Sequence, residues 1–438
     1  MHKEREAQRK SLLGSMQAVT RIEAKGEPKI GVAEFMSVCE RFGFSKKALR
    51  EVRAIAEREN WGSGPFLANF YSGLKESRVQ AFERTAREFF GVKYAIGASS
   101  GTGALHAAFV AAGVGPGKEV ICPAIGFIAT ASAIEMAGGK PVFCDVDLSL
   151  HMDPAKIAAL ITPRTVAIAP TCVMGGVYQA EAIMKVARKH RLRVVEDCAQ
   201  SCGGSYRGRL LGTYGDLGCF SISAYKIAGG GEGGLVITNK KRTWERASQL
   251  AESGGLWRPE RFAPPRYEGE LFPGTNYRMS ELEAAVDVVQ LKRLPQTLKR
   301  CRMVSRRVLG RLKRFEGITP QRINDPEGHI GYCLRFYPES FALGERIIDG
   351  LLAQKIDAGT RGRHGRPDWH IYSYMYPITL KYGYGRGDCP VADDLFDRMI
   401  TINLNQWYSA KDCDELAGRI NRVLESCCAP DFAAPEWL

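Results

Sequence analysis

The chain has 438 residues, of which 45% are hydrophobic and 25% are charged, a composition typical of a globular protein with two or three domains. No apolar run is long enough for a membrane helix, and residues 1–6 lack the apolar core of a signal peptide, so we expect a cytoplasmic protein with no membrane partner. The net charge of +13 is compatible with binding either to nucleic acid or to small anions. Because the basic residues are dispersed and no nucleic-acid-binding motif is present, we expect that the protein does not bind nucleic acid.

The 13 cysteines are scattered along the chain, many of them inside apolar runs. An odd number of cysteines in a long chain without a signal peptide favours reduced thiols. Cys198 and Cys202 are spaced like half of a metal site, but no second pair follows at the spacing of zinc ligands. We therefore expect small buried hydrophobic side chains and no metal.

Residues 1–60 are polar and strongly charged, with helical spacing over Val32–Phe42 and over Ser45–Glu57, where Ser45 is a plausible N-cap. We interpret this stretch as an N-terminal helical extension. It could cover the entrance of an active site, strengthen a dimer or have no catalytic role, and the structural role is favoured.

After a predicted helix at Glu76–Phe90, strand-like and helix-like segments alternate up to residue 196. Such alternation indicates a parallel sheet with helices on both faces. The alternating segments are Tyr94–Ala98, Ala104–Ala112, Glu119–Pro123, Thr130–Met136, Pro141–Asp145, Asp153–Leu160, Val166–Pro170, Ala180–His190 and Leu192–Glu196.

A turn of small residues, Ser99–Gly103, joins the first of these strands to the helix that follows. Free backbone N–H groups and the helix dipole at such a turn make an anion-binding site. A single turn of this kind is weak evidence by itself.

The apolar run Arg193–Glu196 leads directly to Asp197, which places a carboxylate at the carboxyl end of a buried parallel strand. Ligands of open α/β sheets bind at that edge. In pyridoxal phosphate enzymes an aspartate pairs with the protonated pyridine nitrogen, and a lysine holds the aldehyde carbon. Asp197 is therefore a candidate for the aspartate.

Lys226 is the candidate for the lysine. It stands at the mouth of a glycine-rich loop, Gly229–Gly234, between two apolar strand-like runs. An ε-amine becomes nucleophilic toward an aldehyde when desolvation lowers its pKa, and it then forms a Schiff base. On this stretch alone, a lysine of an ordinary surface turn is an equally good interpretation.

Four ordered motifs between about Phe66 and Arg422 resemble the DegT/StrS family of pyridoxal phosphate-dependent sugar aminotransferases. Several motifs in order are more specific than any single glycine string. The motifs are SSGTGALH at residues 99–106, VEDCAQ at 195–200, FS at 220–221 followed by Lys226 and GEGG at 231–234, and NYRMSE at 276–281.

The resemblance implies a fold-type I aminotransferase, an α/β protein whose large domain has a mostly parallel sheet flanked by helices. The implied division is a helical extension at 1–60, a large cofactor-binding domain at 61–297 and a small α+β domain at 298–438. In the small domain we expect a helix from about Leu298 to Phe315, a strand at Ile330–Phe336, and helices at Gly344–Ala353 and Ala410–Ser426. A loop at 361–370 that mixes cations and aromatics is suspected to face the substrate.

The resemblance also implies the roles of single residues toward pyridoxal 5'-phosphate. Lys226 would hold the aldehyde and then move the proton, and Asp197 would hold the ring nitrogen. Gly101, Thr102 and Ser221 would bind the phosphate, Phe127 would stack on the ring, and Gln200 would approach the ring oxygen. Without the resemblance, Phe127 is better explained as a core residue.

Asn276 is implied to reach the phosphate of the neighbouring subunit, so that a homodimer completes its active sites at the subunit interface. A helix cap is nearly as good an explanation of this residue. The chain departs from the family where Cys172-Val173-Met174-Gly175 replaces His-Leu-Tyr-Gly and where Ala224 replaces a proline. The first departure lies near the mouth of the implied site and indicates an unusual substrate.

The resulting hypothesis is an aminotransferase that moves an amino group from glutamate or glutamine to a keto-sugar or keto-cyclitol, in the biosynthesis of an amino sugar, an antibiotic or a polysaccharide. The alternatives are a pyridoxal phosphate-dependent sugar dehydratase or deoxygenase on the same scaffold and a non-catalytic regulator. The dehydratases replace the lysine by histidine, and a regulator would be expected to lose Lys226 or Asp197. The presence of both residues favours transamination.

Overall fold

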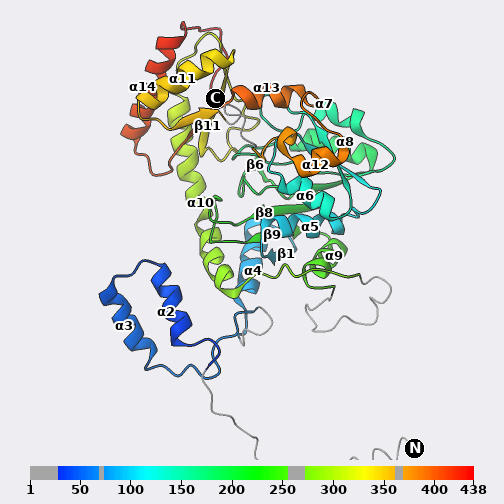
Figure 1. Ribbon diagram of the computed structural model, residues 1–438, viewed down its shortest axis with the longest axis vertical. Helices are drawn as coiled ribbons and strands as arrows, with labels where there is room; N and C mark the ends of the chain where they lie inside the picture. The colour runs from blue at the N-terminus through cyan, green and yellow to red at the C-terminus, as the bar shows by residue number, and fades with distance from the viewer. Residues whose placement is uncertain (1–27, 69–73, 255–271, 361–367) are drawn as a thin grey trace, which may run out of the picture. The chain divides into compact units, whose positions relative to one another are not determined.

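The structure is a computed structural model of the chain, and it describes residues 28–68, 74–254, 272–360 and 368–438 (Figure 1). It divides into two compact units, one of residues 1–67 with 71–73 and one of residues 68–70 with 74–438. The strands of the two larger sheets all belong to the second unit.

The N-terminal unit contains the two helices that the sequence predicts, α2 (Val32–Arg41) and α3 (Lys46–Ala56). The Ser45 hydroxyl caps α3 by accepting a hydrogen bond from the Ala48 N–H at 3.2 Å. Trp61 closes the unit, since its indole donates to the Ala56 carbonyl at 2.8 Å and its ring lies 5.7 Å from that of Phe35. The role of this unit stays a prediction.

The large sheet has seven strands in the order β1-β9-β8-β5-β4-β2-β3. The pairs β8–β5, β5–β4, β4–β2 and β2–β3 are parallel, whereas β9 runs antiparallel to both β8 and β1. The strands are β1 (Tyr94–Ala98), β2 (Glu119–Pro123), β3 (Lys140–Cys144), β4 (Thr165–Ile168), β5 (Arg193–Asp197), β8 (Leu217–Ser221) and β9 (Gly234–Thr238). This mostly parallel sheet confirms the predicted fold class.

Helices cover both faces of this sheet, and the two apolar layers show which helix lies on which face. One layer contains residues of α4 (Arg78–Phe90), α8 (Ala180–His190) and α10 (Glu281–Leu309). The other contains residues of α5 (Gly101–Ala111), α6 (Ala129–Met136), α9 (Lys241–Ala251), α12 (Tyr376–Tyr382) and α13 (Pro390–Arg398). Smaller elements are α7 (Pro154–Ile157), the 3-10 turns at Ala158–Leu160 and Tyr372–Tyr374, and the short strands β6 (Ser205–Tyr206) and β7 (Arg209–Leu210).

The strands read as unbroken apolar runs because successive side chains enter opposite layers. In β8, Cys219 packs in the layer of α5, whereas Phe220 packs in the layer of α4 and α10. In β2, Val120 and Cys122 lie on the α5 side and Ile121 on the other. A strand buried on both faces needs no polar alternation, which is why the parallel sheet could be predicted from the sequence.

A smaller antiparallel sheet follows, in the order β10-β11-β13-β12. Its strands are β10 (Ile318–Pro320), β11 (Cys333–Pro338), β12 (Ala358–Thr360) and β13 (Ile400–Asn403). Leu334 and Phe336 pack in one apolar cluster with residues of α11 (Phe341–Ala353) and α14 (Ala410–Cys427). The alternation of side chains along β11 therefore turns Cys333 and Arg335 to the opposite face.

Helix α10 corrects one prediction. The sequence predicts a helix that begins near Leu298, but one helix of 29 residues begins at Glu281 and runs through Pro295. Leu291, Leu294 and Leu298 are buried along one side of it, while Pro295 is exposed, so burial of the leucines offsets the helical hydrogen bond that the proline cannot donate. The predicted domain boundary at 297/298 falls inside this helix, and the division into a large and a small domain stays a prediction.

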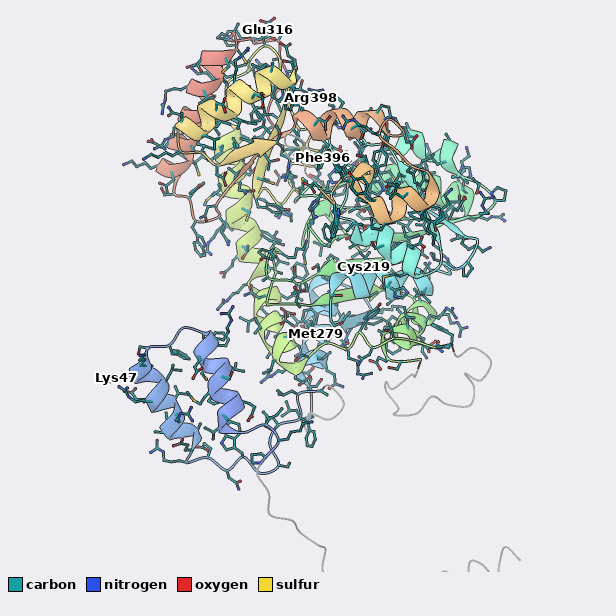
Figure 2. All side chains as sticks on the ribbon, viewed as in Figure 1. Lys47, Cys219, Met279, Glu316, Phe396 and Arg398 are labelled. Carbon is teal, nitrogen blue, oxygen red and sulfur yellow. The ribbon has the colours of Figure 1, made fainter. Side chains whose placement is uncertain are left out.

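The figures show how the two sheets are joined within the second unit. In Figure 1, α10 runs from the level of β8 and β9 to the small sheet. Figure 2 places Met279 near the lower end of α10, and Phe396 and Arg398 at the end of α13 that faces the small sheet. Arg398 donates to the Pro338 carbonyl of β11 at 2.7 Å, and Phe396 is fully buried in the layer of α5.

The remaining predicted segments occur with small shifts. Helix α5 begins at Gly101, three residues earlier than expected, and β11 begins at Cys333, three residues later than expected. All 13 cysteines are free thiols, and 11 of them are buried, as expected for small hydrophobic side chains. Among the described residues, no helix is long and apolar enough to cross a membrane.

The close packing of β9 against the start of α5 can be tested at Gly234. A Cβ at this position would lie 2.1 Å from the Ser100 carbonyl oxygen, which is backbone and has no room to move. We expect Gly234→Ala to lower the free energy of unfolding by about 1–3 kcal/mol, measured by urea denaturation. Gly359→Ala in β12 is the control, since a Cβ there meets nothing within 4 Å, and equal stability of the two variants would contradict the account.

Candidate active site

Seven of the eight predicted residues line one cavity of about 400 Å³ at the carboxyl edge of the large sheet. They are Gly101, Thr102, Phe127, Asp197, Gln200, Ser221 and Lys226. Asn276 does not line this cavity. The sheet brings these residues together from segments that are up to about 125 positions apart in the sequence.

The start of helix α5 supplies the first wall of the cavity. The Ser100 hydroxyl caps the helix by accepting from the Gly103 N–H at 3.0 Å, so Gly101 and Thr102 lie in the first turn, where backbone N–H groups have no helical partner. Gly101 must be glycine, because a Cβ there would lie 2.7 Å from the Ser221 Cβ. This close approach places the last residue of β8 beside the helix N-terminus, as an anion site requires.

Asp197 ends β5 and is 3% exposed. Its carboxylate accepts hydrogen bonds from the Thr130 hydroxyl at 2.5 Å and from the Ala199 N–H at 3.0 Å. Burial raises the pKa of Asp197, while these two donors and the charge of Lys226 act in the opposite direction. A cation in the cavity would favour the ionised carboxylate further.

The neighbouring carboxylate, Glu196, points to the other face of the strand and is occupied by structural contacts. It accepts from the Tyr178 hydroxyl at 2.6 Å, from the Gly212 N–H at 2.7 Å and from the Gly215 N–H at 2.6 Å. Two adjacent acids in one sequence motif therefore have different surroundings, and Asp197 is the one that faces the cavity.

Lys226 lies in a loop that leaves β8 and returns to β9. Backbone hydrogen bonds close this loop, from Ile222 N–H to the Gly233 carbonyl at 2.8 Å and from Ala224 N–H to the Gly231 carbonyl at 2.8 Å. The Lys226 side chain is half-buried, and burial lowers the pKa of its amine, while the charges of Asp197 and Glu232 oppose this shift. A lysine of an ordinary surface turn would not line a cavity opposite a buried aspartate.

Gln200 and Phe127 also face the cavity. The Gln200 side-chain carbonyl accepts from the Met174 N–H at 2.7 Å, which leaves its amide NH₂ as a donor toward the cavity. Phe127 is 40% exposed and its ring lies 5.2 Å from that of His370, so it is not a core residue.

Asn276 is exposed, and its side-chain carbonyl accepts from the Arg278 N–H at 3.1 Å. It does not cap helix α10, because Ser280 occupies that position and accepts from the Leu282 N–H at 3.2 Å. The helix-cap alternative is therefore wrong, and the predicted reach toward a second subunit stays a prediction.

Sequence reasoning missed several residues of this cavity. Thr130 binds Asp197 across 67 positions, and no local pattern indicates that contact. His370 belongs to the loop that was suspected to face the substrate, and it lines the cavity, whereas residues 361–367 of that loop lie outside the described residues.

A second cavity, of about 440 Å³, shares Gln200, Tyr225, Lys226 and His370 with the first. Its other residues come from the segment after β4 and from the small sheet, among them Met174, Tyr332, Arg335 and Thr401. A molecule in the first cavity can therefore extend past Lys226 toward the small sheet.

A profile of the DegT/DnrJ/EryC1/StrS aminotransferase family matches residues 46–421. The chain belongs to this family. The predicted resemblance is confirmed, and with it the prediction of an aminotransferase.

Two relatives and one solved structure illustrate the similarity. The chain is 36% identical over 349 residues to the GDP-perosamine synthase of Caulobacter vibrioides, covering 79% of this chain and 90% of the relative. It is 36% identical over 393 residues to the L-glutamine:2-deoxy-scyllo-inosose aminotransferase of Streptomyces fradiae, covering 84% and 91%. The solved aminotransferase from Psychrobacter cryohalolentis superposes with a TM-score of 0.70 at 27% identity, covering 82% and 94% of the two chains, which confirms the aminotransferase fold.

Two further carboxyl groups lie against the glycine loop that follows Lys226. Glu283 and Asp287, one turn apart on α10, face this loop, where a Cβ at Gly230 would lie 2.2 Å from an Asp287 oxygen and one at Gly231 2.5 Å from a Glu283 oxygen. Burial, and then the charge of Glu283, raises the pKa of Asp287 to about 8. Asp287 therefore holds its proton to a higher pH than an exposed aspartate does, and it lies with Glu283 against the loop.

The raised pKa of Asp287 predicts how the stability of the fold depends on pH. An aspartate with a pKa of about 8 in the folded chain and near 3.8 in the unfolded chain stabilises the fold at low pH, and that stability is lost as the pH rises toward 8. We expect the free energy of unfolding to fall by roughly 2–5 kcal/mol between pH 4 and pH 8, and Asp287→Asn to remove most of this slope.

Urea denaturation at several pH values measures the slope. The exposed Asp357 provides the control, because Asp357→Asn should leave the slope unchanged. If Asp287→Asn and wild type show the same slope, the pKa of Asp287 is not raised in the folded chain.

Proposed function

We propose that this chain is a pyridoxal phosphate-dependent aminotransferase that moves an amino group from glutamate or glutamine to a keto-sugar or keto-cyclitol. The reaction belongs to the biosynthesis of an amino sugar or aminocyclitol. The single observation that carries the proposal is the cavity in which Lys226 lies opposite the buried Asp197, beside an anion site at the start of α5.

The residues of the cavity fit the cofactor from end to end. The N-terminus of α5 with Gly101, Thr102 and Ser221 suits a phosphate, and glycine at position 101 leaves the room that a side chain would fill. Asp197 suits a protonated pyridine nitrogen, and the exposed ring of Phe127 offers a surface for stacking. The Gln200 NH₂ is a donor for the ring oxygen.

When bound, pyridoxal phosphate supplies the electron sink that makes the amino-acid α-proton acidic. Lys226 would hold the aldehyde carbon in the resting enzyme. When free, the Lys226 amine would take the proton from the donor α-carbon and would then hold that proton as the acid for the following transfer. Burial lowers the pKa of Lys226, so more of this amine is unprotonated near neutral pH than for an exposed lysine.

Asp197, when ionised, would hold the proton at the ring nitrogen. Thr130 and the Ala199 N–H support that state, because both donate to the carboxylate. The second half of the cycle reverses these proton transfers on a ketone acceptor, and the same lysine serves both halves.

The donor and acceptor classes follow from the relatives. One relative is named a GDP-perosamine synthase, after an amino sugar. Another is named an L-glutamine:2-deoxy-scyllo-inosose aminotransferase, after glutamine and a keto-cyclitol. Of the stretch Cys172–Gly175, which departs from the family's usual string, Met174 lines the second cavity, so the acceptor pocket of this chain would have its own shape.

The proposed enzyme is a homodimer. Asn276 is exposed, and if its side chain left the Arg278 N–H it could reach the phosphate bound by a second copy. The division into an extension at 1–60, a cofactor domain at 61–297 and a small domain at 298–438 belongs to the same proposal.

The alternative functions are less well supported. A dehydratase or deoxygenase of this family would have histidine in place of Lys226, and a non-catalytic regulator has no need for a half-buried lysine opposite a buried aspartate. Both residues are present in one cavity, which favours transamination.

Lys226→Ala tests the proposal. We expect at least a 1,000-fold loss of transamination, on the order of 4 kcal/mol of transition-state stabilisation, because the variant lacks both the covalent anchor and the proton carrier. Borohydride reduction of the holoenzyme followed by peptide mapping should locate the cofactor on Lys226 in the wild type and not in the variant.

The control for this experiment is Lys185→Ala, which removes an exposed lysine of α8 and should change neither activity nor labelling. Full activity of Lys226→Ala, or a reduced adduct on another lysine of the wild type, would contradict the proposal.

A further inference from the structure

A third cavity, of about 560 Å³, lies at the end of the small sheet, and its described lining shares no residue with the first cavity. Its walls come from the turn between α11 and β12, from the end of β13 with the residues that follow, and from one face of α14. Pockets that bind small molecules have volumes of about 300–1,000 Å³. The third cavity is therefore large enough for a molecule of the size of a sugar.

The floor of the third cavity is apolar. Ile356, Ile402 and Leu404 line it, and all three are buried in the apolar cluster that joins the small sheet to α11 and α14. Leu416 of α14 is half-buried against the same cluster and completes the floor. Such a surface suits the carbon skeleton of a ligand, because covering it removes apolar area from water.

Helix α14 supplies one charged side of the rim. Asp412, Glu415 and Arg419 follow the helical spacing of three and four residues, so they lie on the same face of the helix as Leu416. Arg419 pairs with Glu415 at 2.9 Å and donates to the Gln354 carbonyl at 3.1 Å, so these two charges offset each other. Asp412 caps the start of α14 through only one of its two carboxylate oxygens.

The turn before β12 supplies the other charged side of the rim. Lys355 and Asp357 are exposed there, and within the part of the chain that the structure describes neither forms an ion pair. Asp357 and Asp412 therefore place two negative charges on the rim against the one positive charge of Lys355. This excess favours a cationic ligand over an anionic one.

Neutral hydrogen-bonding groups lie between these charges. Asn403, Asn405 and Tyr408 all line the cavity. The Asn405 side-chain carbonyl accepts from the Trp407 N–H at 3.0 Å, which leaves its amide NH₂ as a donor. Tyr408 is half-buried and offers both an aromatic face and a hydroxyl group. Amide and hydroxyl groups around an apolar floor suit a carbon ring that carries several hydroxyls.

The third cavity adjoins the second cavity, which Lys226 lines. Asn403 and Leu404 line both of them. The Leu404 N–H also donates to the carbonyl of Tyr332, another residue of the second cavity, at 2.8 Å. A molecule held in the third cavity therefore lies against a segment that borders the site of the reaction.

We propose that the third cavity binds a polyhydroxylated amine, with its ammonium group at Asp357 and its carbon ring on Leu404 and Leu416. Its hydroxyl groups bind to the polar side chains of Asn405 and Tyr408. The product of the proposed reaction, an amino sugar or an aminocyclitol, has this chemistry, so the ligand is a product held outside the active site. The choice of ligand rests on the proposed function, whereas the cavity and its charges do not.

Calorimetry with the full-length holoenzyme tests the binding with two probes, D-glucosamine for an amino sugar and scyllo-inosamine for an aminocyclitol. We expect saturable binding of at least one probe, with a dissociation constant on the order of 1 mM or tighter. The probe that binds more tightly identifies the source of the ligand. D-glucose lacks the ammonium group and putrescine lacks the hydroxyls, and we expect each to bind at least about 10-fold more weakly.

Asp357→Asn tests the position of the ammonium group. We expect it to weaken binding by about 10-fold, because it removes the charge and keeps the size of the side chain. Glu339→Gln is the matched control, since it removes an exposed acid that follows β11 and does not line the cavity, and we expect unchanged binding.

Leu416→Trp tests the floor separately from the charge. The larger side chain should fill the cavity and abolish binding of both amines, whichever acid holds the ammonium group. An amine that bound at Lys226 instead would change the visible band of the cofactor and would be unaffected by either substitution. Unchanged affinity in both Asp357→Asn and Leu416→Trp would overturn the proposal, as would equal binding of D-glucose or putrescine by the wild type.

The proposed function can fail independently of this inference. If the wild-type holoenzyme shows no spectral response to L-glutamate or L-glutamine, yet binds an amine in a manner that depends on Asp357, the aminotransferase proposal fails and the third cavity remains an amine site. If the wild type responds to a donor and binds neither amine, only the inference about the third cavity is wrong.

Discussion

The pairing of a buried carboxylate with a half-buried amine across one cavity is the constraint on which the rest of this structure depends. Asp197 and Lys226 are each moved out of water, and each partly offsets the effect of burial on the other. Both side chains line the cavity, so both remain available to a ligand. The cavity therefore suits a molecule that has both a cationic ring, which Asp197 can bind, and a carbonyl carbon, which Lys226 can bind.

The large sheet provides the positions for this pair. Asp197 ends β5, Ser221 ends the adjacent strand β8, and helix α5 begins beside them because glycine at positions 101 and 234 lets the backbone approach closely. The antiparallel strand β9 returns the chain after the lysine loop, and this return fixes both ends of the loop. Beneath the loop, the Glu283–Asp287 pair gives it a buried polar support.

Sequence reasoning predicted the fold and most of the cavity because the relevant signals are local. Unbroken apolar strands, a small-residue turn before α5, and single polar residues at strand ends can all be read from short segments. Thr130 and Arg335 could not be assigned in this way. The contact of Thr130 with Asp197 joins segments 67 residues apart, and the direction in which Arg335 points depends on the register of β11 with β13. The continuation of α10 through Pro295 was missed because local preference stops a helix there, whereas burial of leucines on both sides of the proline continues it.

The absorbance spectrum of the holoenzyme with pyridoxal phosphate, before and after addition of L-glutamate or L-glutamine, tests the central claim most directly. The account predicts a visible band of lysine-bound cofactor that is replaced by a near-ultraviolet band of aminated cofactor when a donor is added. Absence of the visible band would contradict the role of Lys226. A visible band that responds to neither donor would contradict the proposed amino transfer from glutamate or glutamine.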